Sequence, residues 1–120
     1  MPKNILTEYQ EQCLLVQYLE LKGLLFSKLA QETFTKSWGI KMKNKMSGVR
    51  PGVPDMLIIL PNQKLLFIEM KKLKGGHTSP EQIKWVKELN YCKGVIAVEA
   101  HGFEEAKQFV DHFSRLISNL

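Results

Sequence analysis

Asp55-Met56-Leu57-Ile58-Ile59-Leu60 and Leu65-Leu66-Phe67-Ile68-Glu69-Met70-Lys71 are the two segments that decide the fold of this 120-residue chain. Both are mainly apolar, and the Pro61-Asn62-Gln63-Lys64 segment between them is typical of a turn. We therefore predict a hairpin with strands over residues 55–60 and 65–71. Both faces of the second strand are apolar before Glu69, so we expect this strand to lie at the centre of a sheet.

Charged residues stand at the ends of the hairpin that should meet. Antiparallel pairing would place Asp55 opposite residues 69–71, where facing side chains come within ~5 Å. Alternation puts Glu69 and Lys71 on one face of their strand. A buried carboxylate needs a cation or hydrogen bonds, whereas a Glu69–Lys71 ion pair on the surface would explain the pattern without a site.

Carboxylates in this arrangement suit a divalent cation. Mg2+ takes oxygen ligands in octahedral geometry and usually keeps several waters. The pattern offers Asp55, Glu69 and a backbone carbonyl, that of Met70, as protein ligands. Such a cation neutralises charge on a phosphate, and Lys71 would orient the attacking water or help remove its proton.

The remaining elements are predicted from helix caps and apolar periodicity. We expect helices over residues 5–22, 80–90 and 103–117, strands over 24–29 and 94–98, and a long basic loop over 32–54. Thr7 should cap the first helix, and the second should begin at Ser79 with Gln82 completing a capping box. The apolar residues of the second helix (Ile83, Val86 and Leu89) should be buried.

The predicted fold is a single α/β domain over residues 1–120, in the order α-β-β-β-α-β-α. Strand, helix and strand across residues 65–98 imply a parallel crossover. Together with the antiparallel hairpin, this gives a mixed sheet with helices on both faces.

Net charge favours an anionic partner. The formal charge is +5 at pH 7 and the pI is near 9.3, which points to nucleic acid first and anionic lipid second. Trp38 in the basic segment could stack on an unpaired base or simply pack. The basic residues that could contact DNA phosphates, or be ordinary solvated charges, are Lys36, Lys41, Lys43, Lys45, Arg50, Lys72 and Lys74.

Several other classes are disfavoured. Cys13 and Cys92 form no CxxC pair, which argues against a disulfide framework or a zinc ribbon and suits a reducing cytosol. No apolar run approaches the ~20 residues of a membrane span. The sequence also lacks a P-loop and the HxH and HExxH spacings, so we expect no membrane, no nucleotide cofactor and no HNH-type or zinc-hydrolase mechanism.

Three motifs resemble those of a known family. Gly52-Val53-Pro54-Asp55, then Glu69-Met70-Lys71, then Ser79-Pro80-Glu81-Gln82-Ile83-Lys84-Trp85 resemble, in order and spacing, the VRR-NUC family of the PD-(D/E)xK nuclease superfamily. The segments Glu8–Gln12 and Gly48–Pro51 fit as well, so the similarity covers nearly the whole chain. The resemblance implies a restriction-endonuclease-like core and a Mg2+- or Mn2+-dependent endodeoxyribonuclease.

The resemblance also implies roles for individual residues. Asp55 and Glu69 would be metal ligands, and Lys71 the catalytic lysine. Gln82 would support that lysine or the scissile phosphate, although capping its own helix explains it equally well. A glutamate from the first helix would join the site; Glu8 and Glu11 share a face, with Glu8 slightly preferred, and favourable interaction with the helix dipole explains either without a site.

The family further implies structure-selective cleavage, of a Holliday junction or of flap and other branched DNA, by a homodimer. We expect a cytoplasmic enzyme of a bacterium or a phage-infected host. The alternatives are a non-catalytic DNA-binding module on a nuclease-like fold, and an interaction protein whose charges are ordinary surface.

Overall fold

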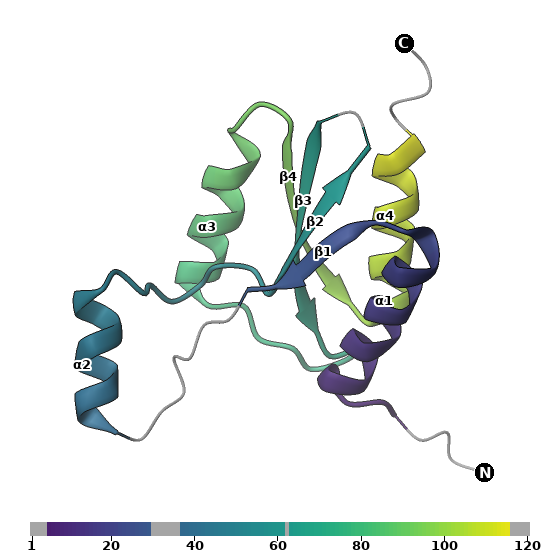
Figure 1. Ribbon diagram of the computed structural model, residues 1–120. Helices are drawn as coiled ribbons and strands as arrows, with labels where there is room; N and C mark the ends of the chain where they lie inside the picture. Colours follow the sequence, from purple (N-terminus) through teal and green to yellow (C-terminus); the bar gives the residue numbers. More distant parts are fainter. Residues whose placement is uncertain (1–4, 30–36, 62, 116–120) are drawn as a thin grey trace.

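A single four-stranded sheet forms the centre of the molecule (Figure 1). The computed structural model describes residues 5–29, 37–61 and 63–115. The strands lie in the order β1 (Leu25–Lys28), β2 (Met56–Leu60), β3 (Lys64–Lys71) and β4 (Val95–His101). The first three pair antiparallel and β3 pairs parallel with β4, so the predicted mixed sheet is confirmed.

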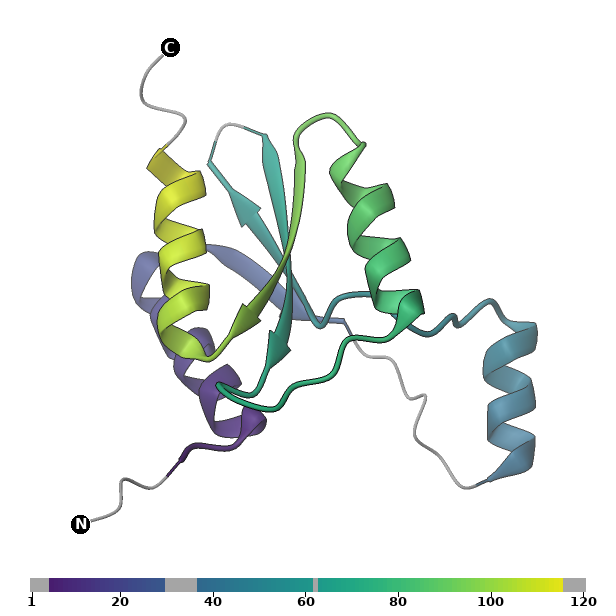
Figure 2. The same cartoon turned by 180° about the vertical axis from the view of Figure 1, so that it is seen from behind.

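Helices cover both faces of this sheet. Figures 1 and 2 show α1 (Glu8–Lys22) and α4 (Phe103–Arg115) side by side on one face, and α3 (Pro80–Asn90) on the other. None of the helices in the described residues is long and apolar enough to cross a membrane.

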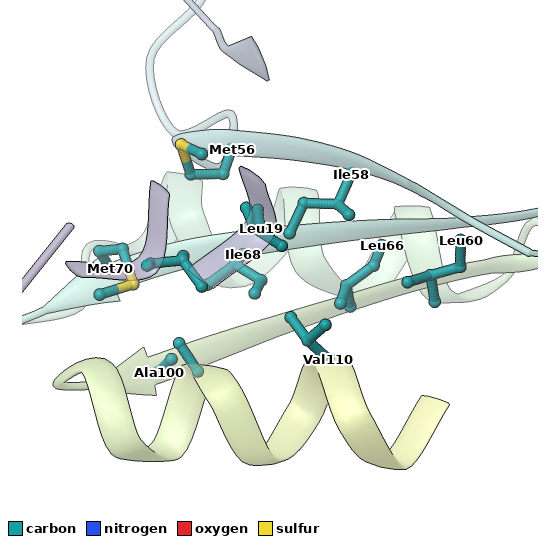
Figure 3. Packing of buried hydrophobic residues seen from close by; sticks show 11 residues of the cluster. Leu19, Met56, Ile58, Leu60, Leu66, Ile68, Met70, Ala100 and Val110 are labelled. Atoms are coloured by element: carbon teal, nitrogen blue, oxygen red, sulfur yellow. The ribbon is translucent and has the colours of Figure 1, made fainter. Parts of the chain in front are cut away.

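The hydrophobic core lies between the sheet and the α1–α4 layer. Leu66, Ile68 and Met70 of β3 are completely buried there, and Figure 3 shows Leu66 and Ile68 facing Val110 of α4. Because side chains alternate along a strand, Glu69 and Lys71 point to the opposite face, toward α3. Burial of the apolar side chains of β3 on one face of the sheet therefore places Glu69 and Lys71 on the other face.

The register of the β2–β3 ladder places Asp55 next to Glu69. Met56 pairs with Ile68 and Leu57 with Phe67 along the β2–β3 ladder. Continuing that ladder by one pair sets Asp55 opposite Glu69.

The predicted helix caps are present. Thr7 and Gln10 form a capping box at the start of α1, and Ser79 and Gln82 form one at the start of α3. In each capping box, the two side chains accept hydrogen bonds from two backbone N–H groups that would otherwise lack a partner at the start of the helix.

The segment predicted as a long loop over residues 32–54 contains a helix, α2 (Trp38–Met46), so that prediction was wrong for these residues. Ser37 caps α2, and none of its residues, all of which are described, is buried. Figures 1 and 2 show α2 standing apart from the sheet. The helix has a signal in the four-residue spacing of Trp38, Met42 and Met46, which the prediction did not use, and no burial supports it.

Two further predictions need correction. Ile83, Val86 and Leu89 were expected to be buried, but Ile83 is 57% exposed and the other two are only half-buried. The helix turns Gln82, Val86 and Leu89 toward the sheet and leaves Ile83 at the flank. Strand β4 is longer than predicted and continues to His101. The last helix is described to Arg115, and residues 116–117 of the prediction lie outside the described part of the chain.

At Gly52, the loop before Asp55 packs closely against the backbone of the first turn of α3. The φ of Gly52 is +97°, and a Cβ there would lie 2.6 Å from the Glu81 carbonyl carbon.

We expect Gly52→Ala to destabilise the protein by about 2–4 kcal/mol, from left-handed backbone strain and a clash with main chain. Urea unfolding would measure this. Gly48→Ala is the matched control, since Gly48 has φ +102° and open space around it. Equal losses in the two variants would contradict the close packing at Gly52.

Candidate active site

A cleft of about 760 Å³ opens where the charged end of β3 meets the first turn of α3. Its lining includes the sequence-predicted residues Asp55, Glu69, Lys71, Gln82 and Glu8. The other lining residues are Gln12, Lys28, Leu29, Pro51, Gly52, Val53, His77 and Ser79. Side chains from α1, β1, β3 and α3 thus converge on one concave site.

Asp55 and Glu69 form a close pair of carboxyl groups in this cleft. Asp55 Oδ2 accepts a hydrogen bond from the Met70 N–H at 3.0 Å, and Glu69 is only 6% exposed. Burial, and then the hydrogen bond and negative charge of Asp55, raise the pKa of Glu69 to about 9, while the Lys71 ammonium opposes the shift. The pair therefore holds a proton at neutral pH unless another cation takes its place.

Lys71 is a buried ammonium group, 8% exposed. Its Nζ donates to the His77 carbonyl at 2.6 Å and to Gln82 Oε1 at 2.9 Å. Two acceptors at these distances hold the group in one position at the cleft, where its charge acts on Glu69.

Gln82 joins the helix cap to the charged groups. Its Oε1 accepts from the Ser79 N–H at 3.0 Å as well as from Lys71, and its Nε2 donates to Glu69 Oε1 at 3.2 Å. The two interpretations of this residue from sequence, a capping partner and a support for the lysine, are satisfied by the same amide.

The loop that supplies the His77 carbonyl is fastened to β4. Thr78 donates to the carboxylate of Glu99, whose other oxygen lies 3.4 Å from His101 Nε2. A Cβ on Gly76 would lie 3.1 Å from Lys71 Cβ, so the loop passes directly over the lysine. These contacts place the main chain that holds Lys71.

The two glutamates of α1 differ in their surroundings. Glu11 Oε2 accepts from the Phe103 N–H at 2.6 Å and so satisfies the first turn of α4. Glu8 instead lines the cleft, and its charge contributes to the raised pKa of Glu69. The geometry favours Glu8 over Glu11 as the helix glutamate of the site.

The basic residues predicted to contact DNA fall in different places. Lys36 lies outside the described residues. Lys41, Lys43 and Lys45 are exposed on α2, with Trp38 72% exposed on the same helix. Lys72 and Lys74 are exposed on the loop after β3. Arg50 donates to the carbonyls of Lys45 and Val49.

Lys28 and Gln12 line the cleft but were missed by the sequence analysis. Lys28 pairs with Met56 across the β1–β2 ladder, and the Leu29 N–H donates to the Asp55 carbonyl at 2.7 Å. The register of β1 would have identified Lys28 as a neighbour of Asp55. Gln12 lies one turn after Glu8, and helical spacing would have identified it.

The donor set fits a hard dication. Two carboxyl groups that share a proton can exchange it for a divalent cation, which prefers oxygen ligands. Among residues 5–29, 37–61 and 63–115, no three or more His, Cys, Asp or Glu side chains gather as a metal-binding group. A site of two carboxylates, one backbone carbonyl and waters requires no third such side chain.

Comparison with known proteins identifies the family. The VRR-NUC domain matches residues 3–104. The chain belongs to the VRR-NUC family. This is a family of nucleases, and membership implies a nuclease domain with DNA as its substrate. The resemblance of the three sequence motifs is thereby confirmed.

Two solved structures agree with this assignment. One, "VRR_NUC domain", has a TM-score of 0.65 and 24% identity, covering 88% of this chain and 96% of its own. Another, "VRR_NUC domain protein", has a TM-score of 0.64 and 22% identity, covering 97% of this chain and 92% of its own. At these identities the likeness shows the fold, a restriction-endonuclease-like core in agreement with the prediction. None of the curated proteins compared with the chain matches it.

The raised pKa of Glu69 makes the stability of the metal-free protein depend on pH. The folded state holds the proton more tightly than the unfolded chain, whose glutamates titrate near 4.3. This stabilisation is complete below that value and is lost as pH rises toward about 9. We expect Glu69→Gln to match the wild type near pH 4 and to melt several degrees higher at pH 9.

Thermal unfolding in EDTA at both pH values would measure the effect. Glu20→Gln, at an exposed position on α1, is the control and should follow the wild type. An identical pH dependence in Glu69→Gln and wild type would contradict the shared proton.

Proposed function

We propose that this protein is a Mg2+- or Mn2+-dependent endodeoxyribonuclease that cuts branched DNA at the Asp55–Glu69–Lys71 cleft. The observation that carries the proposal is a pair of acidic side chains beside a buried lysine that two acceptors hold in place. This arrangement stabilises the fold poorly, because it buries charge and places two carboxyl groups together. It does suit hydrolysis of a phosphodiester.

Each residue has a distinct role in this reaction. Asp55, Glu69 and the Met70 backbone carbonyl would hold the cation, and Glu8 would add its negative charge from the wall of the same cleft. The cation neutralises charge on the phosphate and makes a water easier to deprotonate. Lys71 would orient the attacking water through an N–H of its ammonium group or, as a neutral amine, accept the proton of that water, and Gln82 would keep Lys71 and Glu69 in place.

The substrate we propose is a Holliday junction or a flap. The basic residues on α2 and on the loop after β3 contact the phosphates, which makes binding sensitive to salt. We also propose a homodimer, because two symmetry-related active sites suit the paired cuts of a four-way junction.

Substitutions of the acidic groups and of Lys71 should abolish DNA cleavage while leaving DNA binding largely unchanged. We expect Asp55→Asn, Glu69→Ala and Lys71→Ala each to reduce cleavage of branched DNA at least about a hundredfold, with DNA affinity within a few-fold of wild type. Labelled junctions, flaps, duplexes and single strands would be incubated with Mg2+, Mn2+ or EDTA, and affinity measured in parallel without metal.

Lys93→Ala, at an exposed position beyond α3, is the control and should retain activity. A Glu69→Ala variant that cuts at the wild-type rate would show that the site is elsewhere. A folded wild type that binds junctions without cutting them in either metal would favour the non-catalytic DNA-binding module.

A separate experiment tests the proposed homodimer. Trp38, Met42 and Met46 lie on one face of α2, four residues apart, and are 72%, 39% and 81% exposed. We expect sedimentation equilibrium at micromolar concentration to give twice the chain mass, and Trp38→Ser with Met46→Ser to weaken association at least tenfold. Leu21→Ser, 83% exposed on α1, should leave association unchanged. A wild-type chain that stays monomeric at 100 µM would contradict the dimer.

A further inference from the structure

A second cavity, of about 390 Å³, lies beside the cleft on the outer side of α3. Pro51 lines both, so the two are neighbours. The remaining lining residues of the second cavity are Arg50, Glu81, Lys84, Trp85 and Glu88. None of these has a role in the cation site described above.

We propose that this cavity binds an unpaired nucleobase of the DNA strand that is cut, next to the cut itself. The proposal rests on the nuclease function proposed above and deepens it, since it names the feature of branched DNA that the protein recognises. The volume falls within the range of pockets that hold small ligands. The lining is mainly apolar, as stacking of a base on an aromatic ring requires.

Trp85 is fixed before any ligand binds. Its indole Nε1 donates to the Pro51 carbonyl at 3.1 Å, and the adjoining Gly52 packs against the Glu81 backbone. The ring therefore keeps its orientation, and little side-chain freedom remains to be lost on stacking.

The charges of the cavity distinguish a base from a phosphate. Glu81 and Glu88 repel a phosphate, whereas their carboxylates can accept hydrogen bonds from the exocyclic amino groups of cytosine and adenine. Arg50 and Lys84 supply the opposite charge for the phosphates on either side. The arrangement suits a base within the cavity and its backbone along the edge.

The spacing along α3 relates this cavity to the cut. Gln82 contacts Glu69 and Lys71 in the cleft, and Trp85 follows it by three residues, so their Cβ atoms lie about 5–6 Å apart on one helix face. A strand with a phosphate at Glu69 would bring an adjacent nucleotide to Trp85. A base in a continuous duplex is stacked and paired, whereas a base at a branch point is free to enter.

The test uses 2-aminopurine at single unpaired positions of a flap, with the Glu69→Gln variant to prevent cutting. We expect fluorescence quenching at the one or two positions next to the cut, and none for the same base in a duplex. Trp85→Leu should abolish the quenching and raise the Kd for the flap at least fivefold, while Trp85→Phe should restore most of both. Tyr91→Leu, 75% exposed at the end of α3, is the matched control and should behave as wild type.

The outcomes separate the two proposals, because quenching reports binding and does not require cleavage. A wild type that cuts flaps, with quenching and flap affinity unchanged in a folded Trp85→Leu variant, would overturn the base-binding cavity and leave the nuclease intact. Loss of dimer in Trp85→Leu, with no change in quenching, would show that the cavity receives a second copy of the chain and would also overturn the proposal.

Discussion

The burial of charged groups at the end of β3 constrains the arrangement of everything around it. Glu69 and Lys71 are almost completely shielded from water, and such groups are tolerated only when partners satisfy them. Those partners come from outside the strand: Asp55 from the loop before β2, the His77 carbonyl from the loop after β3, and Gln82 from α3. Displacing any of these elements would leave a charge unsatisfied. The position of each loop is therefore tied to the protonation and hydrogen bonding of the site.

Gln82 shows how local structure and chemistry are coupled. The same amide closes the capping box of α3 and holds Lys71 and Glu69. It can do both only if α3 is rotated so that Gln82 faces the sheet. That rotation leaves Ile83 exposed and turns Trp85 toward Pro51. A helix whose orientation was set by apolar burial alone would place Ile83 inside. The polar contacts outweigh that preference at this end of the helix, where each charge-assisted hydrogen bond contributes about 1.5–3 kcal/mol.

Much of this arrangement is predictable from sequence because it depends on local patterns. The strands of the hairpin follow from two apolar runs and a turn, the starts of α1 and α3 follow from their caps, and the position of Glu69 and Lys71 follows from alternation. Other features depend on tertiary contacts that no local pattern records. The helix α2 buries none of its residues, so its short apolar stripe is not supported by packing against the core. The choice between Glu8 and Glu11 depends on how α1 packs against α4, because the Phe103 N–H takes Glu11 as its acceptor. Lys28 depends on the register of a strand of only four residues.

The negative charge of the cleft disfavours binding of DNA phosphates when no cation is present. DNA phosphates are repelled by Glu8 and by the negative charge that remains on the Asp55–Glu69 pair, so affinity for DNA has to come from elsewhere on a chain of net charge +5. The exposed lysines of α2 and of the loop after β3 can supply it, because each phosphate neutralised releases counterions. Under the proposed function, a divalent cation then reverses the local repulsion only where the carboxylates hold it. Under the same proposal, binding and cutting depend on separate groups of opposite charge, and a phosphate is stabilised in the cleft only when the cation accompanies it.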